Sequence, residues 1–382
     1  MSVSDRPVPL GVLLRSAPPD RLPEVAADHL RRHYGAERVE VYVPDLTLSS
    51  LCPLLGEPGP DTEPAVLRCL GSQRPDTQAT ATGATRLHLP LNCWGERVGV
   101  LRLDLPSRPE PELTEELAAH ADDLATALRA AGTVTDRYRR AQRRARLTMA
   151  AELQWDLLPG RSLADERFLV AGQLEPAYDV RGDHFDWSLD GDRLTLTVLN
   201  GFGDGMESAL LTSLAVNAMR NARRCGADIV EQAELASDAV HSRHGGGAHL
   251  STLLLQIDLV AGAVAAVDAG SPRCLVARRG GVEAVELEQQ LPFGMFGEAH
   301  YEIQRFDLEP GDRLLVVSDG VHEAAPSGRR AFGESALLSA LRRTRLQPAT
   351  EAVGTVMRSL RDYHSGAEPE DDAVTVCLDW RR

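Results

Sequence analysis

Lysine is absent from this chain of 382 residues, so all 41 residues of the Lys plus Arg count are arginines. Aspartate and glutamate together number 56, which gives a formal net charge of −15. Contacts with nucleic-acid phosphates need a basic surface, so this balance argues against a nucleic-acid binder and against a membrane role. Aromatic residues are scarce at 4%, but the apolar content of 43% is too high for a disordered chain. A chain of 382 residues is longer than one hydrophobic core usually supports, so we expect two domains.

Paired cysteines are also missing. None of the six cysteines belongs to a C-x-x-C pair, which excludes the usual zinc sites and a disulfide framework and predicts reduced, mostly buried thiols. No apolar run has the length of a membrane span, and the first residues lack the apolar core of a signal peptide. By elimination we expect a cytoplasmic protein. The cysteines are Cys52, Cys69, Cys93, Cys225, Cys274 and Cys377.

The first part of the chain, residues 9–111, has the pattern of a small α+β domain. Apolar residues at helical spacing begin at Leu22 and are closed by Gly35. Residues 39–43 have the composition of a strand, and residues 87–105 alternate on both sides of a turn, which predicts a hairpin. A helix, strands, a loop-rich middle and a closing hairpin before a long helix resemble a GAF sensor domain. No residue set here identifies a ligand.

Residues 112–158 predict one long linker helix, with Thr114 as a capping residue. Mostly apolar residues recur every seven positions along this segment. Such a repeat is typical of a coiled coil, which would join two chains into a homodimer and transmit a signal. An amphipathic helix packed on its own domain explains the same pattern. The six arginines of residues 137–146 are interpreted as a solvated face. The seam consists of Leu117, Leu124, Ala131, Tyr138 and Ala145, with Ala121, Leu128, Thr135, Gln142 and Met149 as the offset set.

The third part, residues 159–382, contains many short segments with strand alternation and two clear helical segments, residues 208–224 and 228–243. This composition predicts an α+β fold in which an antiparallel β-sandwich is flanked by helices. Acidic residues stand at the ends of three of its predicted strands, namely Asp183, Asp319 and Asp371. Carboxylates that converge on one sheet edge repel each other unless cations neutralise them, and such oxygen ligands favour Mg²⁺ or Mn²⁺.

Five segments carry a more specific signal. Residues 174–186 are similar to the pattern PA-x-x-V-G-G-D-F-Y-D, and residues 152–159 to the lead-in Q-x-x-L-L-P. Residues 308–324 follow L-x-P-G-D-x-L-L-L-Y-T-D-G-V-x-E-A, residues 371–375 follow D-D-x-T, and residues 292–294 stand for P-L-G. In order and spacing they resemble the SpoIIE/RsbU-type phosphatases of the metal-dependent PPM (type-2C) family.

This resemblance implies a two-metal hydrolase that acts on phosphoserine or phosphothreonine in proteins. Two Mn²⁺ or Mg²⁺ ions about 4 Å apart would hold a bridging water, lower its pKa and clamp the phosphoryl oxygens. The implied partner is the family's usual substrate, a phosphorylated anti-sigma-factor antagonist in a sigma-factor partner-switching pathway. By position, the candidate catalytic residues and metal ligands are Asp183, Asp319 and Asp371, with Asp372 as the substitute for Asp371 and Gly182 as a neighbouring candidate.

The resemblance breaks at residue 200. Where the family has D-x-x-G-H-G or D-V-S-G-K-G, with an Asp that bridges both metals, this chain has Asn200 followed by Gly201. An amide offers one good oxygen and no charge, so Asn200 is a weaker candidate ligand. Either Asp204 or water replaces the lost ligand and activity survives, or the domain is a pseudophosphatase that serves as an adaptor, or Asn200 deamidates to Asp. The family pattern A-G-H-x-P is altered too, since Ser271 replaces its histidine.

Overall fold

The computed structural model describes residues 8–381, except 47, 49, 57–63, 81–82, 144–146, 178–179, 280, 327–329 and 366–368. It divides into two compact units, Met1–Arg146 and Leu147–Arg382. Of the helices within the described ranges, none combines the length and the apolar character needed to cross a bilayer.

The first unit is built on one five-stranded antiparallel sheet with the strand order β2-β1-β5-β4-β3. The hairpin of β4 and β5 turns at Trp94 and Gly95, which both have positive φ, as the sequence predicted for this segment. The strands are β1 (Arg38–Pro44), β2 (Leu51–Leu55), β3 (Asp76–Ala79), β4 (Thr85–Cys93) and β5 (Glu96–Leu105).

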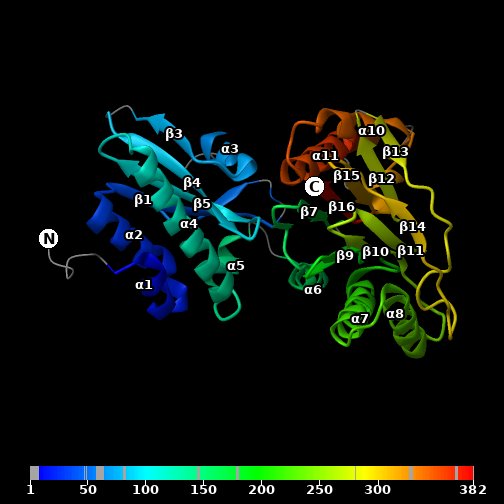
Figure 1. Cartoon of the computed structure of the whole chain (residues 1–382). Coiled ribbons are helices and arrows are strands. Elements are labelled where there is room, and N and C mark those ends of the chain that lie inside the picture. The colour runs from blue at the N-terminus through cyan, green and yellow to red at the C-terminus, as the bar shows by residue number, and fades with distance from the viewer. Residues whose placement is uncertain are drawn as a thin grey trace. The chain divides into compact units, whose positions relative to one another are not determined.

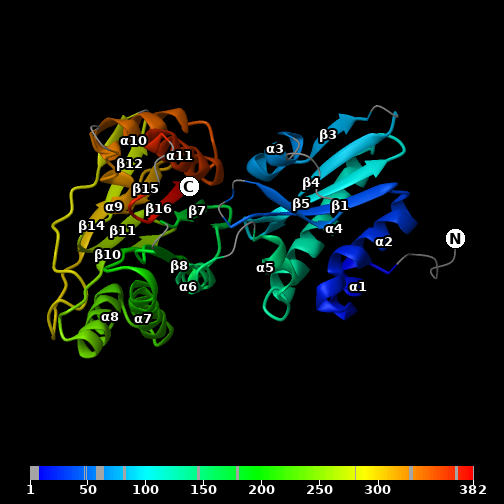
Figure 2. The ribbon, with the colours of Figure 1, turned by 180° about the vertical axis from the view of Figure 1, so that it is seen from behind.

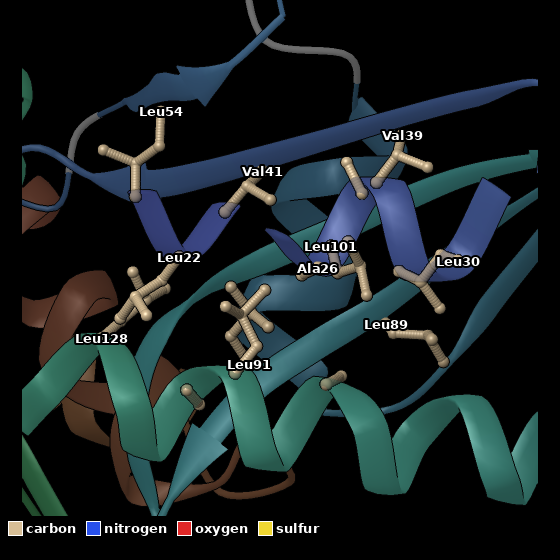
Figure 3. Packing of buried hydrophobic residues seen from close by; sticks show 14 of the residues in the cluster. Leu22, Ala26, Leu30, Val39, Val41, Leu54, Leu89, Leu91, Leu101 and Leu128 are labelled. Carbon is tan, nitrogen blue, oxygen red and sulfur yellow. The ribbon is translucent and has the colours of Figure 1, made fainter. Parts of the chain in front are cut away.

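Helices cover both faces of this sheet. Leu101 of β5 packs against α2 and α4, as Figure 3 shows, whereas its neighbour Val100 packs against α3 on the opposite face. The unit is therefore an α+β domain, and its likeness to a GAF domain stays a prediction. The helices are α1 (Leu10–Ser16), α2 (Leu22–Tyr34), α3 (Pro64–Ser72), α4 (Pro111–Ala131) and α5 (Arg137–Ala141), with a short 3₁₀ turn at Pro19–Arg21.

The prediction of one continuous helix over residues 112–158 was wrong. The segment forms α4, α5 and α6 (Met149–Leu157), and the first break falls at Gly132, where a poor helix former is followed by the β-branched Thr133, Val134 and Thr135. The predicted seam is not free to pair two chains, because its α4 residues are buried in the core of their own unit. These residues are Leu117, Ala121, Leu124, Leu128 and Ala131; Ala145 and the arginines at 144 and 146 lie outside the described residues.

The second unit contains two antiparallel sheets, with strand orders β14-β11-β10-β9-β8 and β13-β12-β15-β16-β7-β6. The first sheet consists of β8 (His184–Asp190), β9 (Arg193–Asn200), β10 (Ser251–Asp258), β11 (Ala263–Ala269) and β14 (Gln304–Asp307). The second sheet consists of β6 (Ser162–Ala164), β7 (Phe168–Glu175), β12 (Arg273–Arg278), β13 (Gly281–Ala284), β15 (Arg313–Val317) and β16 (Ala373–Trp380).

Alternating side chains of these strands build three apolar layers. Val198 of β9 and Val316 of β15 meet between the sheets, whereas Leu199 faces α7 and α8 and Leu315 faces α10 and α11. Figures 1 and 2 show these two helix pairs on the outer faces of the sandwich. The predicted antiparallel β-sandwich flanked by helices is confirmed. The helices are α6, α7 (Gly205–Arg224), α8 (Ile229–His244), α9 (Asp319–His322), α10 (Phe332–Arg343) and α11 (Ala349–His364).

Candidate metal centre

Two neighbouring strands of the second sheet, β15 and β16, bring Asp319 and Asp371 to one end of the sandwich. In the β15–β16 ladder, Val317 at the end of β15 lies opposite Thr375 near the start of β16. The buried Ser318 extends this pairing, because its N–H donates to the carbonyl of Val374 at 3.0 Å and its Oγ accepts from the Val374 N–H at 2.9 Å. The residues just beyond both strand ends, Asp319 and Asp371, are thereby held at the same end of the sandwich.

Asp372 connects this end of the second sheet to the segment that leads into β8 of the first sheet. Its side chain is fully buried, and both carboxylate oxygens accept hydrogen bonds from the segment that leads into β8. An anionic acceptor for several backbone N–H groups fixes the path of that segment and therefore the position of Asp183. Oδ1 accepts from the N–H of Ala177 at 2.7 Å, and Oδ2 accepts from the N–H groups of Arg181 (2.9 Å), Gly182 (2.8 Å) and Asp183 (3.3 Å) and from Nε2 of Gln154 (2.8 Å).

Gln154 of α6 adds a second connection. The same Nε2 donates to the carbonyl oxygen of Asp183 at 2.7 Å, so one buried amide contacts both Asp183 and Asp372. The lead-in motif at residues 152–159 contains this glutamine, and that motif was the signal for it, although its role was not predicted.

Asp183, which directly precedes β8, lies beside Asn200 at the end of β9. The β8–β9 register pairs His184 with Leu199, and one further step along it places Asp183 beside Asn200. Oδ1 of Asp183 accepts from the N–H of Gly201 at 3.1 Å. Oδ2 of Asp183 and both polar atoms of the Asn200 side chain are buried with no hydrogen-bond partner among the described residues. Buried polar atoms without partners cost free energy. The two oxygens, Oδ2 of Asp183 and Oδ1 of Asn200, are suited to a bound cation, whereas Nδ2 of Asn200 can only donate to a water or another acceptor.

Burial is the main cause of raised pKa values at this centre, and neighbouring carboxylates add to it at Asp183 and Asp371. Burial, reinforced by Asp319, Asp372 and Asp371, raises the pKa of Asp183 well above its ordinary value of 3.8. Burial, followed by the charge of Asp319, raises the pKa of Asp371 to about 6. Burial also raises the pKa of Asp319, against the hydrogen bond from the Gly320 N–H. A divalent cation at this edge would remove this repulsion.

The ligand set fits an open site and not a closed cage. Over the described residues, no three His, Cys, Asp or Glu side chains are arranged so that they could hold an ion by themselves. Carboxylates repel one another over longer distances than those at which they coordinate one ion, so the raised pKa values do not require a closed cage. Mg²⁺ and similar ions are held by one or two carboxylates and keep several waters, so the aspartates present fit such a cation.

The remaining candidates have other contacts. Gly182 has φ +93°, and a Cβ at this position would collide with Oγ of Ser208, so glycine is required. Its carbonyl accepts a hydrogen bond from Oγ1 of Thr212 on α7 at 2.6 Å, and a role as ligand stays a prediction. Asp204 is exposed at the N-cap of α7. Ser271, in place of the family's histidine, donates from Oγ to Oδ2 of Asp319 at 3.4 Å.

The antiparallel sandwich between two helix pairs, with aspartates at one edge and the signatures described above, defines the class of PPM-type serine/threonine phosphatases. Within this class the chain belongs to the SpoIIE family, because the family model "Stage II sporulation protein E (SpoIIE)" matches residues 190–381, half of the chain.

Individual relatives are distant. Protein IcfG of Synechocystis is 22% identical over 264 residues, which are 62% of this chain and 41% of that protein, so the chain spans less than half of its length. Among solved structures, the RsbU and RsbW domains of Rv1364c from Mycobacterium tuberculosis are 23% identical (TM-score 0.49, covering 56% of this chain and 62% of that one). The SiaA-PP2C domain of Pseudomonas aeruginosa is 19% identical (TM-score 0.49, covering 55% and 85%).

Proposed function

We propose that this chain is a metal-dependent protein phosphatase that removes phosphate from phosphoserine or phosphothreonine of a regulatory protein. Its substrate would be a phosphorylated anti-sigma-factor antagonist in a sigma-factor partner-switching pathway. The observation that carries the proposal is the convergence of Asp183, Asp319 and Asp371 at one end of the sandwich, set by the strand registers, where burial and then the charge of Asp319 raise the pKa values of Asp183 and Asp371. A site that concentrates carboxylates in this way is stabilised by a hard divalent cation.

Each residue has a separate task in this mechanism. Asp183, Asp319 and Asp371 would hold the metal together with bound water, each ion taking one or two of these carboxylates, and Mn²⁺ or Mg²⁺ is the proposed cofactor. The bound metal supplies Lewis-acid chemistry and a water of lowered pKa. Asp372 is assigned to positioning, because both of its carboxylate oxygens accept hydrogen bonds from the segment before β8 and one of them also accepts from Gln154 of α6. Ser271 would orient Asp319 through its hydroxyl.

The test is Mn²⁺-dependent hydrolysis of a phosphoserine peptide by the whole chain. We expect turnover that requires Mn²⁺, falls to background in Asp319→Ala and persists in Asp190→Ala. Asp190 is a matched control because it is exposed at the opposite end of β8. An inert wild-type chain that also binds no metal would show that the assignment of the aspartates is wrong.

The second candidate function is a pseudophosphatase that acts as a regulatory binding or adaptor protein. Asn200 favours it, since this buried residue brings no charge to the place of the family's bridging aspartate. Asn200→Asp separates the two functions. An active wild type supports the enzyme, whereas an inert wild type that gains activity on Asn200→Asp supports the adaptor.

The proposed division of labour follows the three parts of the sequence. Residues 9–111 would act as the sensor, residues 112–158 as the connection that carries the signal, and residues 159–382 as the phosphatase. The last helix of the connection, α6, contributes Gln154 to the centre, which supports a route from sensor to site. The proposed compartment is the cytoplasm, where thiols such as the free cysteines of this chain stay reduced.

A further inference from the structure

A cavity of about 440 Å³ lies at the same end of the sandwich as the candidate metal centre. Residues at the end of β11 and at the start of β12 line it, and Ser271 belongs to the connection between these two strands. Oγ of Ser271 donates to Oδ2 of Asp319 at 3.4 Å, and its carbonyl accepts a hydrogen bond at 3.2 Å from Nε2 of His322, which lines the cavity. A single residue therefore connects the cavity to a proposed metal ligand.

The segment that follows β13 forms a second side of the cavity and joins the two sheets. The N–H of Val285 donates to the carbonyl of Cys274 on β12 at 2.9 Å, and the N–H of Gln290 donates to the carbonyl of Asp268 on β11 at 2.8 Å. Ligand pockets usually have an apolar lining with a few polar groups and volumes of about 300–1,000 Å³, and this cavity has that form. Its apolar lining includes Pro272, Leu275, Val285, Leu287 and Leu337.

Asp268 brings a carboxylate oxygen without a partner to this cavity. The residue lines the cavity and is only 5% exposed. Its Oδ1 accepts a hydrogen bond from the N–H of Gly270 at 3.0 Å, whereas its Oδ2 has no hydrogen-bond partner within the described ranges. Burial raises the pKa of Asp268 to about 6, so the group is still mostly ionised at pH 7. Leaving such an oxygen without a donor costs free energy, so this position favours a ligand that donates hydrogen bonds.

Carboxylates outnumber cations around the cavity. Asp268 and three glutamates line it, together with the guanidinium of Arg273. Glu334 also lies 3.8 Å from the guanidinium of the exposed Arg330, which offsets a second negative charge. Burial lowers the pKa of His322, so this residue adds no positive charge at pH 7. Four carboxylates and two guanidinium groups leave two negative charges, which favour a cationic occupant. The glutamates are Glu286, Glu323 and Glu334.

We propose that this cavity is a subsite for an arginine that the substrate protein carries close to its phosphoserine. The inference rests on the proposed phosphatase function and specifies the substrate further. The aliphatic stem of an arginine can lie on the apolar lining while its guanidinium donates to Oδ2 of Asp268. Arg273 is two residues, or about 7 Å of extended strand, from Ser271. The arginine would therefore stand about two or three residues from the phosphoserine.

The test is the hydrolysis of neutral phosphoserine peptides by the whole chain with Mn²⁺. Each peptide carries one arginine at a different position, from three residues before the phosphoserine to three after it. At one position, kcat/KM should exceed that of the matching glutamine peptide about tenfold, because one charge-assisted pair is gained.

Asp268→Asn should abolish most of this preference, since its amide oxygen can still accept from the Gly270 N–H while the charge in the cavity is lost. A change in the position of Ser271 would alter turnover of both peptides alike, so the ratio of their kcat/KM values isolates the subsite. Glu323→Gln, at an exposed lining residue, should reduce the preference less and serves if Asp268→Asn does not fold. Asp190→Asn, at the opposite end of β8, is the matched control and should keep the full preference.

The outcomes separate this inference from the proposed function. Equal kcat/KM of arginine and glutamine peptides at every position would overturn the subsite and leave the phosphatase standing. Preference for a glutamate at the same position would also overturn it, and would assign the cavity to Arg273 and an acidic side chain. If no peptide is hydrolysed, the phosphatase is refuted, and fluorescence anisotropy of labelled peptides still tests the subsite. Tighter binding of one arginine peptide that is lost in Asp268→Asn would support the subsite, and equal binding of all peptides would refute it.

Discussion

Asp372→Asn should destabilise the second unit although it changes only one oxygen into an NH₂ group. The carboxylate accepts at both oxygens, with the N–H of Ala177 on Oδ1 and the other donors on Oδ2. An asparagine that keeps its carbonyl toward the larger group turns its NH₂ toward the Ala177 N–H, so a donor faces a donor. The same carbonyl also carries no charge to strengthen the bonds that remain.

The magnitude follows from these contacts. One buried N–H left without an acceptor costs about 1–3 kcal/mol, and hydrogen bonds to a charged acceptor contribute about 1.5–3 kcal/mol each. Burial raises the pKa of Asp372, against the hydrogen bonds that lower it, and the neutral asparagine avoids this cost of burying a charge, which offsets part of the loss. We therefore expect the free energy of unfolding of the second unit to fall by about 3 kcal/mol.

Urea denaturation followed by tryptophan fluorescence measures this change. Three of the four tryptophans, Trp155, Trp187 and Trp380, lie in the second unit, and Trp94 is 78% exposed, so a Trp94→Phe background makes the signal specific for that unit. Asp371→Asn is the matched control, because it removes the adjacent charge without touching the bonds of the Asp372 carboxylate, and its amide oxygen can still accept from the Asp372 N–H as Oδ1 of Asp371 does. Equal stability of Asp372→Asn and Asp371→Asn would refute the positioning role of Asp372.

Three further outcomes are expected. Because the pKa of Asp371 is raised to about 6 in the folded protein, this residue favours folding fully below pH 3.8, and the contribution is lost as the pH rises through about 6. The melting temperature of the metal-free protein, measured relative to that of Asp371→Asn, should therefore decrease as the pH is raised from 3.8 to 6. A parallel pH dependence of both proteins would contradict this. Gly182→Ala should cost about 2–4 kcal/mol in urea unfolding, because positive φ and the collision with Ser208 add, whereas Gly191→Ala, with φ +55° and open space, should cost about 1 kcal/mol. Gln154→Leu should weaken Mn²⁺ binding in calorimetry by about 10- to 100-fold, and an unchanged affinity would exclude the proposed connection.

Sequence patterns predicted the second unit well because each strand and helix there carries its own signal. The helices predicted at residues 208–224 and 228–243 correspond to α7 and α8, and the capping box of Asp228 and Glu231 explains the sharp start of α8. The aspartates after β15 and before β8 and β16 were found from motifs, and the ladder registers explain why they meet.

Two features could not be predicted from the sequence. A seven-residue repeat says that one helix face is apolar, but not whether a second chain or the helix's own sheet covers it; in α4 the sheet covers Leu117, Leu124 and Leu128. The distinction between Asp371 and Asp372 depends on backbone N–H groups that lie far away in the sequence, near residues 177–183. Only the folded chain shows which of two adjacent carboxylates they engage.

The packing around Asn200 affects how readily this residue deamidates. Deamidation of an Asn-Gly pair requires the backbone nitrogen of the glycine to attack the side-chain carbonyl carbon of the asparagine. The Gly201 N–H is instead bonded to Asp183, and the backbone carbonyl of Arg181 occupies the space where a Cβ of residue 201 would lie. Strand pairing of Asn200 with Ser251 holds the chain extended at the same place. We expect this asparagine to survive long storage with its mass unchanged, so that the neutral residue encoded at position 200 is the one the centre uses.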